Sequence, residues 1–186
     1  MLIDTHCHLD DPKFSHDRDD VIRRAVEAGV KYIINVGSDL KNSKNAVSIA
    51  SKHANVYATV GLHPHDARLL DDAAFAEFKK LARGAKVIAI GEIGLDYFRN
   101  LSPKDIQEDV FKKFLNLAKD MNLPVVIHAR EAEADTLRIL KEYKPKGVMH
   151  CFSASPKMLD EVLAMGLYVS YTCALTFKNA DNLREL

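Results

Sequence analysis

Two histidines stand one residue apart near the start of the chain, in MLIDTHCHLD. The apolar residues before them predict a β-strand over residues 2–6, and successive side chains of a strand point to opposite faces. His6 and His8 are therefore expected to point the same way, with Cys7 pointing to the other face. Neutral imidazole is a common protein ligand of metal ions, so the pair predicts half of a metal site. The alternative is a polar strand end with solvated histidines.

Further histidines, one glutamate and one arginine stand at or just beyond the ends of later apolar runs. Six of the eight histidines have such a position, whereas chance would scatter them over helices and loops. Glu92 lies between two glycines in GEIGLDY, within a run that is otherwise apolar. The full set of strand-end residues is His6, His8, His63, His65, Glu92, His128, Arg130 and His150.

This mixture of imidazoles and one carboxylate is typical of a hydrolytic metal centre. Such a donor set suits Zn²⁺, Mn²⁺ or Mg²⁺ with open coordination positions. Glu92 could bridge two metal ions about 3.5–4 Å apart, the spacing of two-metal hydrolytic sites. The alternative for Glu92 is a carboxylate on a surface loop.

Two of the residues are candidates for contacts with a phosphate. Arg130 lies two residues after His128 and shares its strand face, where a guanidinium would bind an anion. Its alternative is a salt bridge at the rim of the sheet. His63 is followed by Pro64, which favours an extended conformation at the strand end. Its alternative is a structural histidine bonded to the backbone.

Asp96 and Tyr97 are expected on the loop that follows Glu92. From there they could contact a substrate or orient a metal ligand. An ordinary loop role is the alternative for both.

Seven short apolar runs, rich in Val and Ile, alternate with longer helical patterns. Such runs are typical of parallel strands that are buried on both faces. The predicted strands cover residues 2–6, 32–37, 56–62, 87–94, 125–130, 147–151 and 167–172. The predicted helices cover residues 17–28, 40–53, 71–83, 103–121, 131–143, 155–166 and 179–186.

Local signals mark several helix ends. Gly29 is expected to stop the first helix, and either Ser38 or Asp39 to cap the second. Ser102, followed by Pro103, predicts a capping serine with a proline in the first turn.

The alternation predicts an α/β fold with parallel strands, of the (β/α)₈ TIM-type barrel class. Nearly every predicted strand ends in a His, Glu, Asp or Arg, and a barrel gathers all its strand ends at one mouth. A doubly wound sheet would concentrate such residues at one switch point, and no glycine-rich phosphate loop follows the first strand. No linker or compositional break divides the chain, so residues 1–186 are expected to form a single domain.

The composition sets bounds on location and partners. The chain is 47% hydrophobic, and its 26 basic and 26 acidic residues give a formal net charge of zero. This balance argues against broad coating of nucleic acid, but a small grip on a strand end is compatible with it. No apolar run could span a bilayer and no signal-peptide pattern opens the chain. We expect a cytoplasmic protein without membrane contact, its three cysteines buried as small apolar residues.

Six motifs together carry a family resemblance. THCHLD, GLHPH, GEIGLDY, IHAR, HCFS and TFKNA, in this order and spacing, resemble the TatD-like metal-dependent deoxyribonucleases. That family has amidohydrolase-type (β/α)₈ barrels, and the resemblance covers the whole chain.

The resemblance implies a role for each ligand. His6 and His8 would bind one divalent metal ion, Glu92 would bridge two, and His128 and His150 would bind the second. These implied roles agree with the strand-face arguments above.

The resemblance also implies the reaction. It is a two-metal hydrolysis of phosphodiester bonds in DNA, single-stranded or at strand ends, and often exonucleolytic. His63 and Arg130 would contact the scissile phosphate, which makes them, with Glu92, the implied catalytic residues. Substrate contacts by Asp96 and Tyr97 complete the expected site.

The sequence stops at Leu186, before a segment that the family resembled contains. That segment carries an eighth strand and a Thr-Asp-x-Pro motif, whose Asp ligates the first metal and can act as general base. We expect the sequence to be the visible part of a longer chain, truncated at its C-terminus. The alternatives are that the protein itself is a fragment, or that a partner supplies the eighth strand. Seven strands would leave open edges, which favour self-association.

Two other functions remain open at this point. The same metals could serve an esterase or deacylase that acts on aminoacyl-tRNA. Without the eighth-strand Asp, the protein could instead be a catalytically weak binder of metal or nucleic acid.

We expect chelation by EDTA to abolish hydrolysis, and Mg²⁺ or Mn²⁺ to restore it, because metal ions held by the strand-end histidines and Glu92 would polarise the phosphate and activate the attacking water. A nuclease assay before and after dialysis against EDTA measures this. Full activity after dialysis in excess EDTA would contradict the metal hypothesis.

Overall fold

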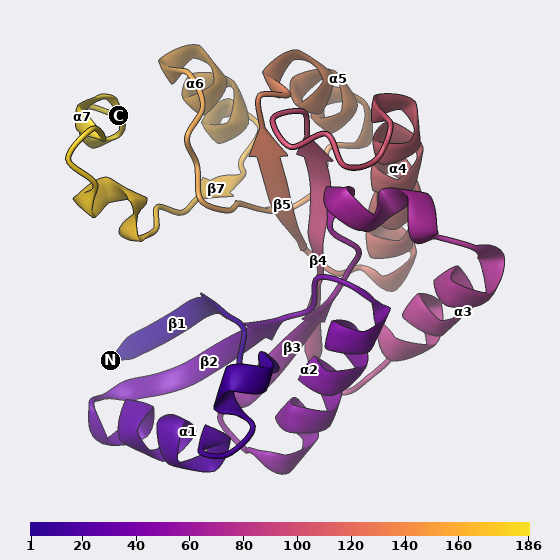
Figure 1. The fold of residues 1–186 in the computed structure, drawn as a ribbon. Helices are drawn as coiled ribbons and strands as arrows, with labels where there is room; N and C mark the ends of the chain where they lie inside the picture. The colour runs from indigo at the N-terminus through magenta and orange to yellow at the C-terminus, as the bar shows by residue number, and fades with distance from the viewer. The chain divides into compact units, whose positions relative to one another are not determined.

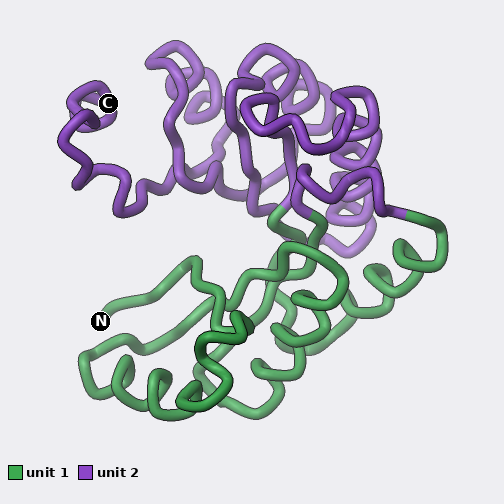
Figure 2. The backbone as a smooth tube through the Cα atoms, in the orientation of Figure 1, with its two compact units in different colours: residues 1–62, 71–92 green, residues 63–70, 93–186 purple.

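The computed structural model of the protein describes residues 1–186. The chain divides into two compact units, which Figure 2 shows in different colours. Unit 1 comprises residues 1–62 and 71–92, and unit 2 comprises residues 63–70 and 93–186. The expectation of a single domain stays a prediction.

Unit 1 contains a parallel sheet with helices in the connections between its strands (Figure 1). Its strands are β1 (Leu2–Cys7), β2 (Val30–Val36), β3 (Val56–Val60) and β4 (Val87–Asp96) up to Glu92. Its helices are α1 (Arg18–Glu27), α2 (Leu40–Lys52) and α3 (Asp72–Leu81), with a 3₁₀ turn, η1 (Pro12–Phe14), after β1. Each strand pairs in parallel with the next along the chain.

Helix α2 packs on β2 and β3 and against α3. The core between them contains Val36, Ala58 and Phe78, none of which is exposed. Asp39, rather than Ser38, caps α2, because its side chain accepts the N–H of Asn42 at 2.6 Å. Apolar packing of the capped helix α2 on β2 and β3 therefore stabilises the sheet of unit 1.

Unit 2 continues the alternation. It contains the end of β4, then β5 (Val125–Arg130), β6 (Gly147–Met149) and β7 (Tyr168–Val169). Its helices are α4 (Lys104–Met121), α5 (Glu133–Tyr143), α6 (Pro156–Ala164) and α7 (Asp181–Arg184). Two 3₁₀ segments, η2 (Pro64–Leu69) and η3 (Cys173–Thr176), complete it.

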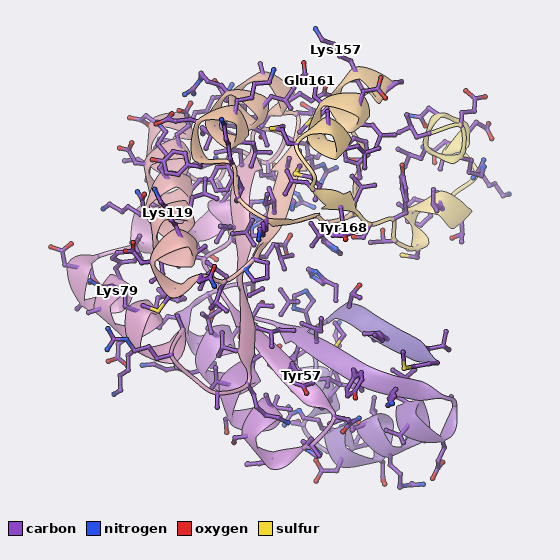
Figure 3. All side chains as sticks on the ribbon, turned by 180° about the vertical axis from the view of Figure 1, so that it is seen from behind. Tyr57, Lys79, Lys119, Lys157, Glu161 and Tyr168 are labelled. Carbon is purple, nitrogen blue, oxygen red and sulfur yellow. The ribbon has the colours of Figure 1, made fainter.

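The core of unit 2 gathers apolar faces of α4, α5 and α6 on the strands. Phe114, Ile127, Leu140 and Met158 are completely buried within it. Charged side chains cover the outer surface, as Lys119 and Lys157 show in Figure 3, and Glu161 of α6 binds Lys141 of α5 at 2.7 Å. None of the helices combines the length and the apolar character that a membrane span requires.

The strand order follows the order of the sequence, from β1 to β7, and the strand pairs are parallel. A doubly wound sheet would instead reverse its order at a switch point. The consecutive order is that of a (β/α)₈ barrel, so the predicted fold class is confirmed. All seven predicted strands are present.

Several predicted strand ends are wrong. The third and sixth strands were expected to end at residues 62 and 151, but β3 ends at Val60 and β6 at Met149. The fourth strand was expected to end at residue 94, but β4 runs on to Asp96, which is therefore a strand residue and not a loop residue. The seventh was expected over residues 167–172, but β7 has two residues, which pair with Val148 and Met149 of β6.

The predicted cap at Ser102 is also wrong. Helix α4 begins at Lys104, and the Ser102 side chain makes no capping bond to it. Its hydroxyl is occupied elsewhere, since it donates to the carbonyl of His65 at 2.8 Å and accepts the N–H of Arg68 at 3.1 Å.

The cysteines differ in exposure. Burial raises the pKa of the Cys7 thiol to about 12, and the Sγ atom lies 3.5 Å from the carbonyl oxygen of Ile34. Cys151 is partly buried, whereas Cys173 in η3 is exposed. The prediction that all three are buried is therefore wrong for Cys173. In β1, Leu2 and Ile3 are also exposed, and self-association through strand edges stays a prediction.

We expect Gly94→Ala to destabilise the protein more than its matched control, Gly29→Ala. Both glycines have a positive φ, +142° and +93°, so an alanine costs about 1–3 kcal/mol at either position. At Gly94 the added Cβ would also clash with the backbone of His128, which costs about 1–3 kcal/mol more, whereas at Gly29 it meets nothing within 4 Å. Urea unfolding of both variants measures the difference, and equal losses would contradict the close approach of β4 and β5.

Candidate metal centre

Unit 1 brings together three of the predicted metal ligands. One ligand atom from each of His6, His8 and Glu92 lies within 4.8 Å of the others. His6 Nε2 is 3.5 Å from Glu92 Oε2, and the two imidazole centroids are 5.1 Å apart. The prediction that both imidazoles share one face is therefore confirmed, and their partner is the buried carboxylate of β4.

The backbone fixes which nitrogen of His8 can bind a cation. His8 Nδ1 is 3.0 Å from the carbonyl oxygen of Val36, at the end of β2. A carbonyl only accepts hydrogen bonds, so Nδ1 carries the proton and donates it. Nε2 of the neutral ring keeps its lone pair, as in metal-binding histidines whose other nitrogen donates to a carbonyl.

A buried side chain holds the segment that follows His8. Asn35 Oδ1 accepts the N–H of Leu9 at 2.7 Å, and neither residue is appreciably exposed. Burial also raises the pKa of the adjacent Asp10 carboxyl above its ordinary value. The polar end of β1 is thus built into the protein and is not a frayed terminus.

Unit 2 gathers a second group of three histidines around one carboxylate. His65 Nε2 and His128 Nε2 lie 2.9 Å and 3.0 Å from the same oxygen, Asp96 Oδ2. The His63 ring packs edge-on against both imidazoles, with centroids 4.2 Å from His65 and 4.5 Å from His128. Three strand-end motifs, GLHPH, GEIGLDY and IHAR, therefore meet in space.

The Asp96 carboxylate is buried and ionised. Burial alone would raise its pKa, but the hydrogen bonds from the Arg99 N–H, His65 and His128 outweigh this and hold the pKa of the carboxyl below its ordinary value. The Arg99 N–H reaches Asp96 Oδ1 at 2.8 Å. Only 1% of the Asp96 side chain is exposed, so it has little surface left for a substrate.

His63 is oriented by the peptide that follows it. Its Nδ1 accepts the N–H of His65 at 3.3 Å, and the extended backbone expected before Pro64 is confirmed. In the neutral ring the proton must then lie on Nε2. Nε2–H is a donor of the kind that binds a phosphate oxygen.

The remaining predicted residues of unit 2 lie at the ends of β5 and β6. His150 follows β6 directly; its N–H donates to Ile127 at 2.8 Å, and its Nδ1 is 3.3 Å from Ser170 Oγ. Arg130 ends β5 and is exposed, with its guanidinium carbon 3.8 Å from the centroid of the Phe98 ring. Stacking of this kind orients the planar guanidinium.

Tyr97 points elsewhere. Its hydroxyl donates to Asp135 Oδ2 at 3.1 Å and lies 3.5 Å from Glu108 Oε1. Burial and these acidic neighbours raise the pKa of the phenol above its ordinary value. The structure does not bring Tyr97 to the histidines, and its contact with a substrate stays a prediction.

The donor atoms of unit 1 fit a divalent metal ion. Two imidazoles and one carboxylate are a set that Zn²⁺ or Mn²⁺ accepts, with room for further ligands. The tautomer of His8 supports this fit. Nδ1 is bonded to the Val36 carbonyl, so the lone pair is on Nε2, the nitrogen that the backbone does not occupy.

Several supporting residues were not predicted from the sequence. Asn35 and Gln107 are completely buried, and Ser102 was assigned to the wrong partner. Gln107 had a detectable signal, since it lies on the same helical stripe as Val110, Phe111 and Phe114, where an apolar residue is expected. A polar residue in such a stripe indicates a buried hydrogen-bonding task.

Comparisons with known proteins agree on one family. A family model described as "TatD related DNase" matches residues 3–186. The uncharacterized metal-dependent hydrolase YabD of Bacillus subtilis is 41% identical, over 100% of this chain and 74% of that protein. The 3'-5' ssDNA/RNA exonuclease TatD of Cronobacter sakazakii is 38% identical, over 92% of this chain and 66% of that protein.

A solved structure supports the same grouping. YjjV, a TatD homolog from Escherichia coli K12, superposes with a TM-score of 0.92 at 32% identity. The match covers 99% of this chain and 73% of that one. The chain thus spans about two thirds to three quarters of the length of these relatives.

We expect Asn35→Ala to lower the free energy of unfolding by about 1–3 kcal/mol, because the buried N–H of Leu9 would lose its acceptor. Asn45→Ala, on the exposed face of α2, is the matched control and is expected to be near neutral. Urea unfolding followed by circular dichroism measures both. Equal stabilities of the two variants would show that Asn35 does not support the segment after His8.

Proposed function

Because the chain belongs to the TatD-related DNase family of metal-dependent hydrolases, we propose that it hydrolyses phosphodiester bonds at the ends of DNA strands. The observation that carries the proposal is the cluster of His6, His8 and Glu92, which fits a divalent ion. Relatives named as 3'-5' ssDNA/RNA exonucleases support single-stranded nucleic acid as the substrate and an exonucleolytic mode.

The proposed cofactor is a pair of divalent ions, Mg²⁺, Mn²⁺ or Zn²⁺. His6, His8 and Glu92 would hold the first, and Glu92, His128 and His150 the second. When bound, such ions polarise the phosphoryl oxygens and lower the pKa of the attacking water. The rest of the task falls to the side chains of the protein.

His63 and Arg130 would bind the phosphate. The backbone N–H of His65 keeps the proton of neutral His63 on Nε2, from which it would be donated to a phosphoryl oxygen. Arg130 ends β5 and would add a charge-assisted bond as negative charge develops on the phosphate. Its contact with Phe98 holds the guanidinium in one plane before the substrate arrives.

The nearly neutral chain would not bind DNA through its overall field. Recognition therefore depends on a few donors at the reacting phosphate, which suits a grip on a strand end. For Asp96 the burial of the carboxylate favours orientation of histidines over contact with the substrate.

We expect Arg130→Ala to lower kcat/KM on a 3'-labelled single-stranded DNA about ten- to a hundredfold and to leave metal content unchanged. A charge-assisted hydrogen bond is worth on the order of 1.5–3 kcal/mol in transition-state binding. Arg138→Ala is the matched control, because Arg138 binds Glu108 and Asp135 on the outer surface of unit 2. Elemental analysis and nuclease rates give the two readouts.

The same preparation tests the reaction class. Cleavage of the DNA, and not of the ester bond of an aminoacyl-tRNA, is the expected result. Hydrolysis of the ester alone would replace the nuclease proposal by a deacylase. Loss of metal in Arg130→Ala would give Arg130 a structural role.

A further inference from the structure

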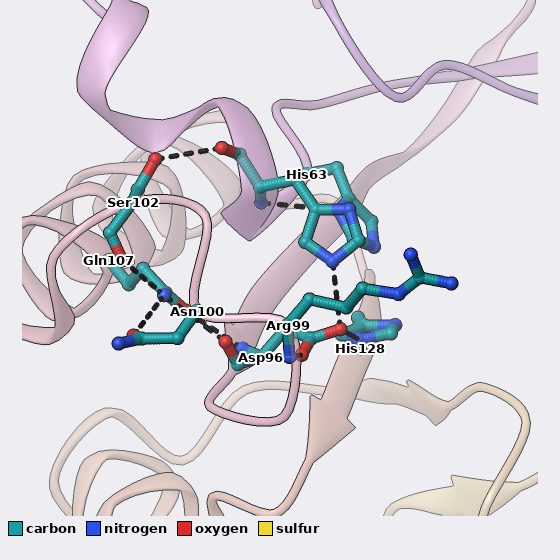
Figure 4. Close-up of polar contacts among 8 residues, drawn as sticks. His63, Asp96, Arg99, Asn100, Ser102, Gln107 and His128 are labelled. Atoms are coloured by element: carbon teal, nitrogen blue, oxygen red, sulfur yellow. Dashed lines mark hydrogen bonds and ion pairs between the residues drawn. The ribbon is translucent and has the colours of Figure 1, made fainter.

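Asp96 receives three N–H donors from three different segments. Its Oδ1 accepts the N–H of Arg99, and its Oδ2 accepts from His65 at 2.9 Å and from His128 at 3.0 Å. Figure 4 shows the carboxylate with two of these partners, Arg99 and His128. We propose that Asp96 is a positioning residue, which sets the proton of both imidazoles on Nε2 and so presents Nδ1 of His128 for metal binding.

The chemistry of the acceptor fixes the tautomer of His128. A carboxylate oxygen accepts hydrogen bonds, and Asp96 Oδ2 lies 2.9 Å from His65 Nε2 and 3.0 Å from His128 Nε2. If Nε2 of His128 carried a lone pair, that lone pair would face an anion 3.0 Å away, which is repulsive. Nε2 therefore carries the proton, and the lone pair of the neutral ring is on Nδ1.

His65 is held by the same oxygen and therefore has the same tautomer. The sequence placed it among the strand-end histidines but assigned it no role. The backbone N–H of His65 orients the His63 ring. The carboxylate that fixes the His65 ring therefore acts on the same segment that carries His63. A single carboxylate thereby orients the rings of His65 and His128 directly and the ring of His63 indirectly.

A completely buried amide anchors the backbone of Asp96. Gln107 Oε1 accepts the Asp96 N–H at 2.8 Å, while its Nε2 donates to the Asp96 carbonyl at 3.2 Å and to the Ser102 carbonyl at 2.7 Å (Figure 4). The end of β4 is thus bonded on both sides of the Asp96 peptide to helix α4. This anchorage leaves the carboxylate little freedom to turn toward a substrate.

Ser102 holds the segment that carries His65. Its hydroxyl donates to the His65 carbonyl at 2.8 Å and accepts the Arg68 N–H at 3.1 Å, which fixes η2 to the segment before α4. Gln107 and Ser102 together hold Asp96 and His65 at a fixed separation. A carboxylate placed in this way orients ligands and does not bind a substrate.

The role of His128 as a metal ligand rests on the proposed function, but its tautomer does not. Long-range ¹H–¹⁵N correlation spectra of the metal-free protein report the protonated nitrogen of each ring. His65→Gln and His128→Gln assign the signals by their disappearance. We expect Nε2–H for both rings near neutral pH, and a dominant Nδ1–H form of His128 would overturn the proposal.

The second measurement uses Asp96→Asn. The amide cannot accept from both rings with a full negative charge, so we expect the Nδ1–H form of His128 to increase and Mn²⁺ affinity, by calorimetry, to fall about 10–100-fold. Asp135→Asn is the matched control: its carboxylate binds Tyr97 and Arg138 but no histidine, and neither readout is expected to change.

The two measurements separate the two proposals. A folded Asp96→Asn protein with unchanged tautomers and Mn²⁺ affinity would overturn the positioning role. If Asp96→Asn does not fold, the spectra of the unaltered protein decide. If the tautomers are as expected but the protein binds no metal and cleaves no DNA, only the proposed function fails.

Discussion

The buried negative charge of Asp96 is the interaction on which the order of unit 2 depends. A carboxylate without exposed surface is tolerable only when donors replace the water it has lost. Here the donors come from η2, from β5 and from the segment after β4, so the cost of burying one charge fixes three segments at once. Removing any one donor would leave the charge less well solvated and the other two segments less well defined.

In unit 1, neutral groups hold the histidine and the segment that follows it. The carbonyl of Val36 orients His8, and the amide of Asn35 holds the next peptide. No charge has to be buried for this, because a main-chain carbonyl already lies at the end of the neighbouring strand. The buried carboxylate of this cluster is that of Glu92, for which we propose the role of a metal ligand.

Much of this arrangement could be predicted from the sequence, for a simple physical reason. Alternation along a strand depends on local geometry alone, so the shared face of His6 and His8 followed from their spacing. The seven apolar runs likewise predicted the strands. What failed was the prediction of partners that are distant in sequence. Ser102 has the local sequence pattern of a helix cap, yet its hydroxyl donates to the backbone carbonyl of His65. The residues next to Ser102 in the sequence give no indication of this bond.

The contrast between the two sets of histidines has a consequence for mutational robustness. Every amino acid carries the same main-chain carbonyl at position 36, so no single side-chain replacement there deletes the acceptor that orients His8. The orientation of His128 depends instead on one side chain, and a single change of the Asp96 codon removes it. Inherited or engineered variation would therefore be tolerated unequally, because the main chain orients His8 whereas His128 depends on a single carboxylate.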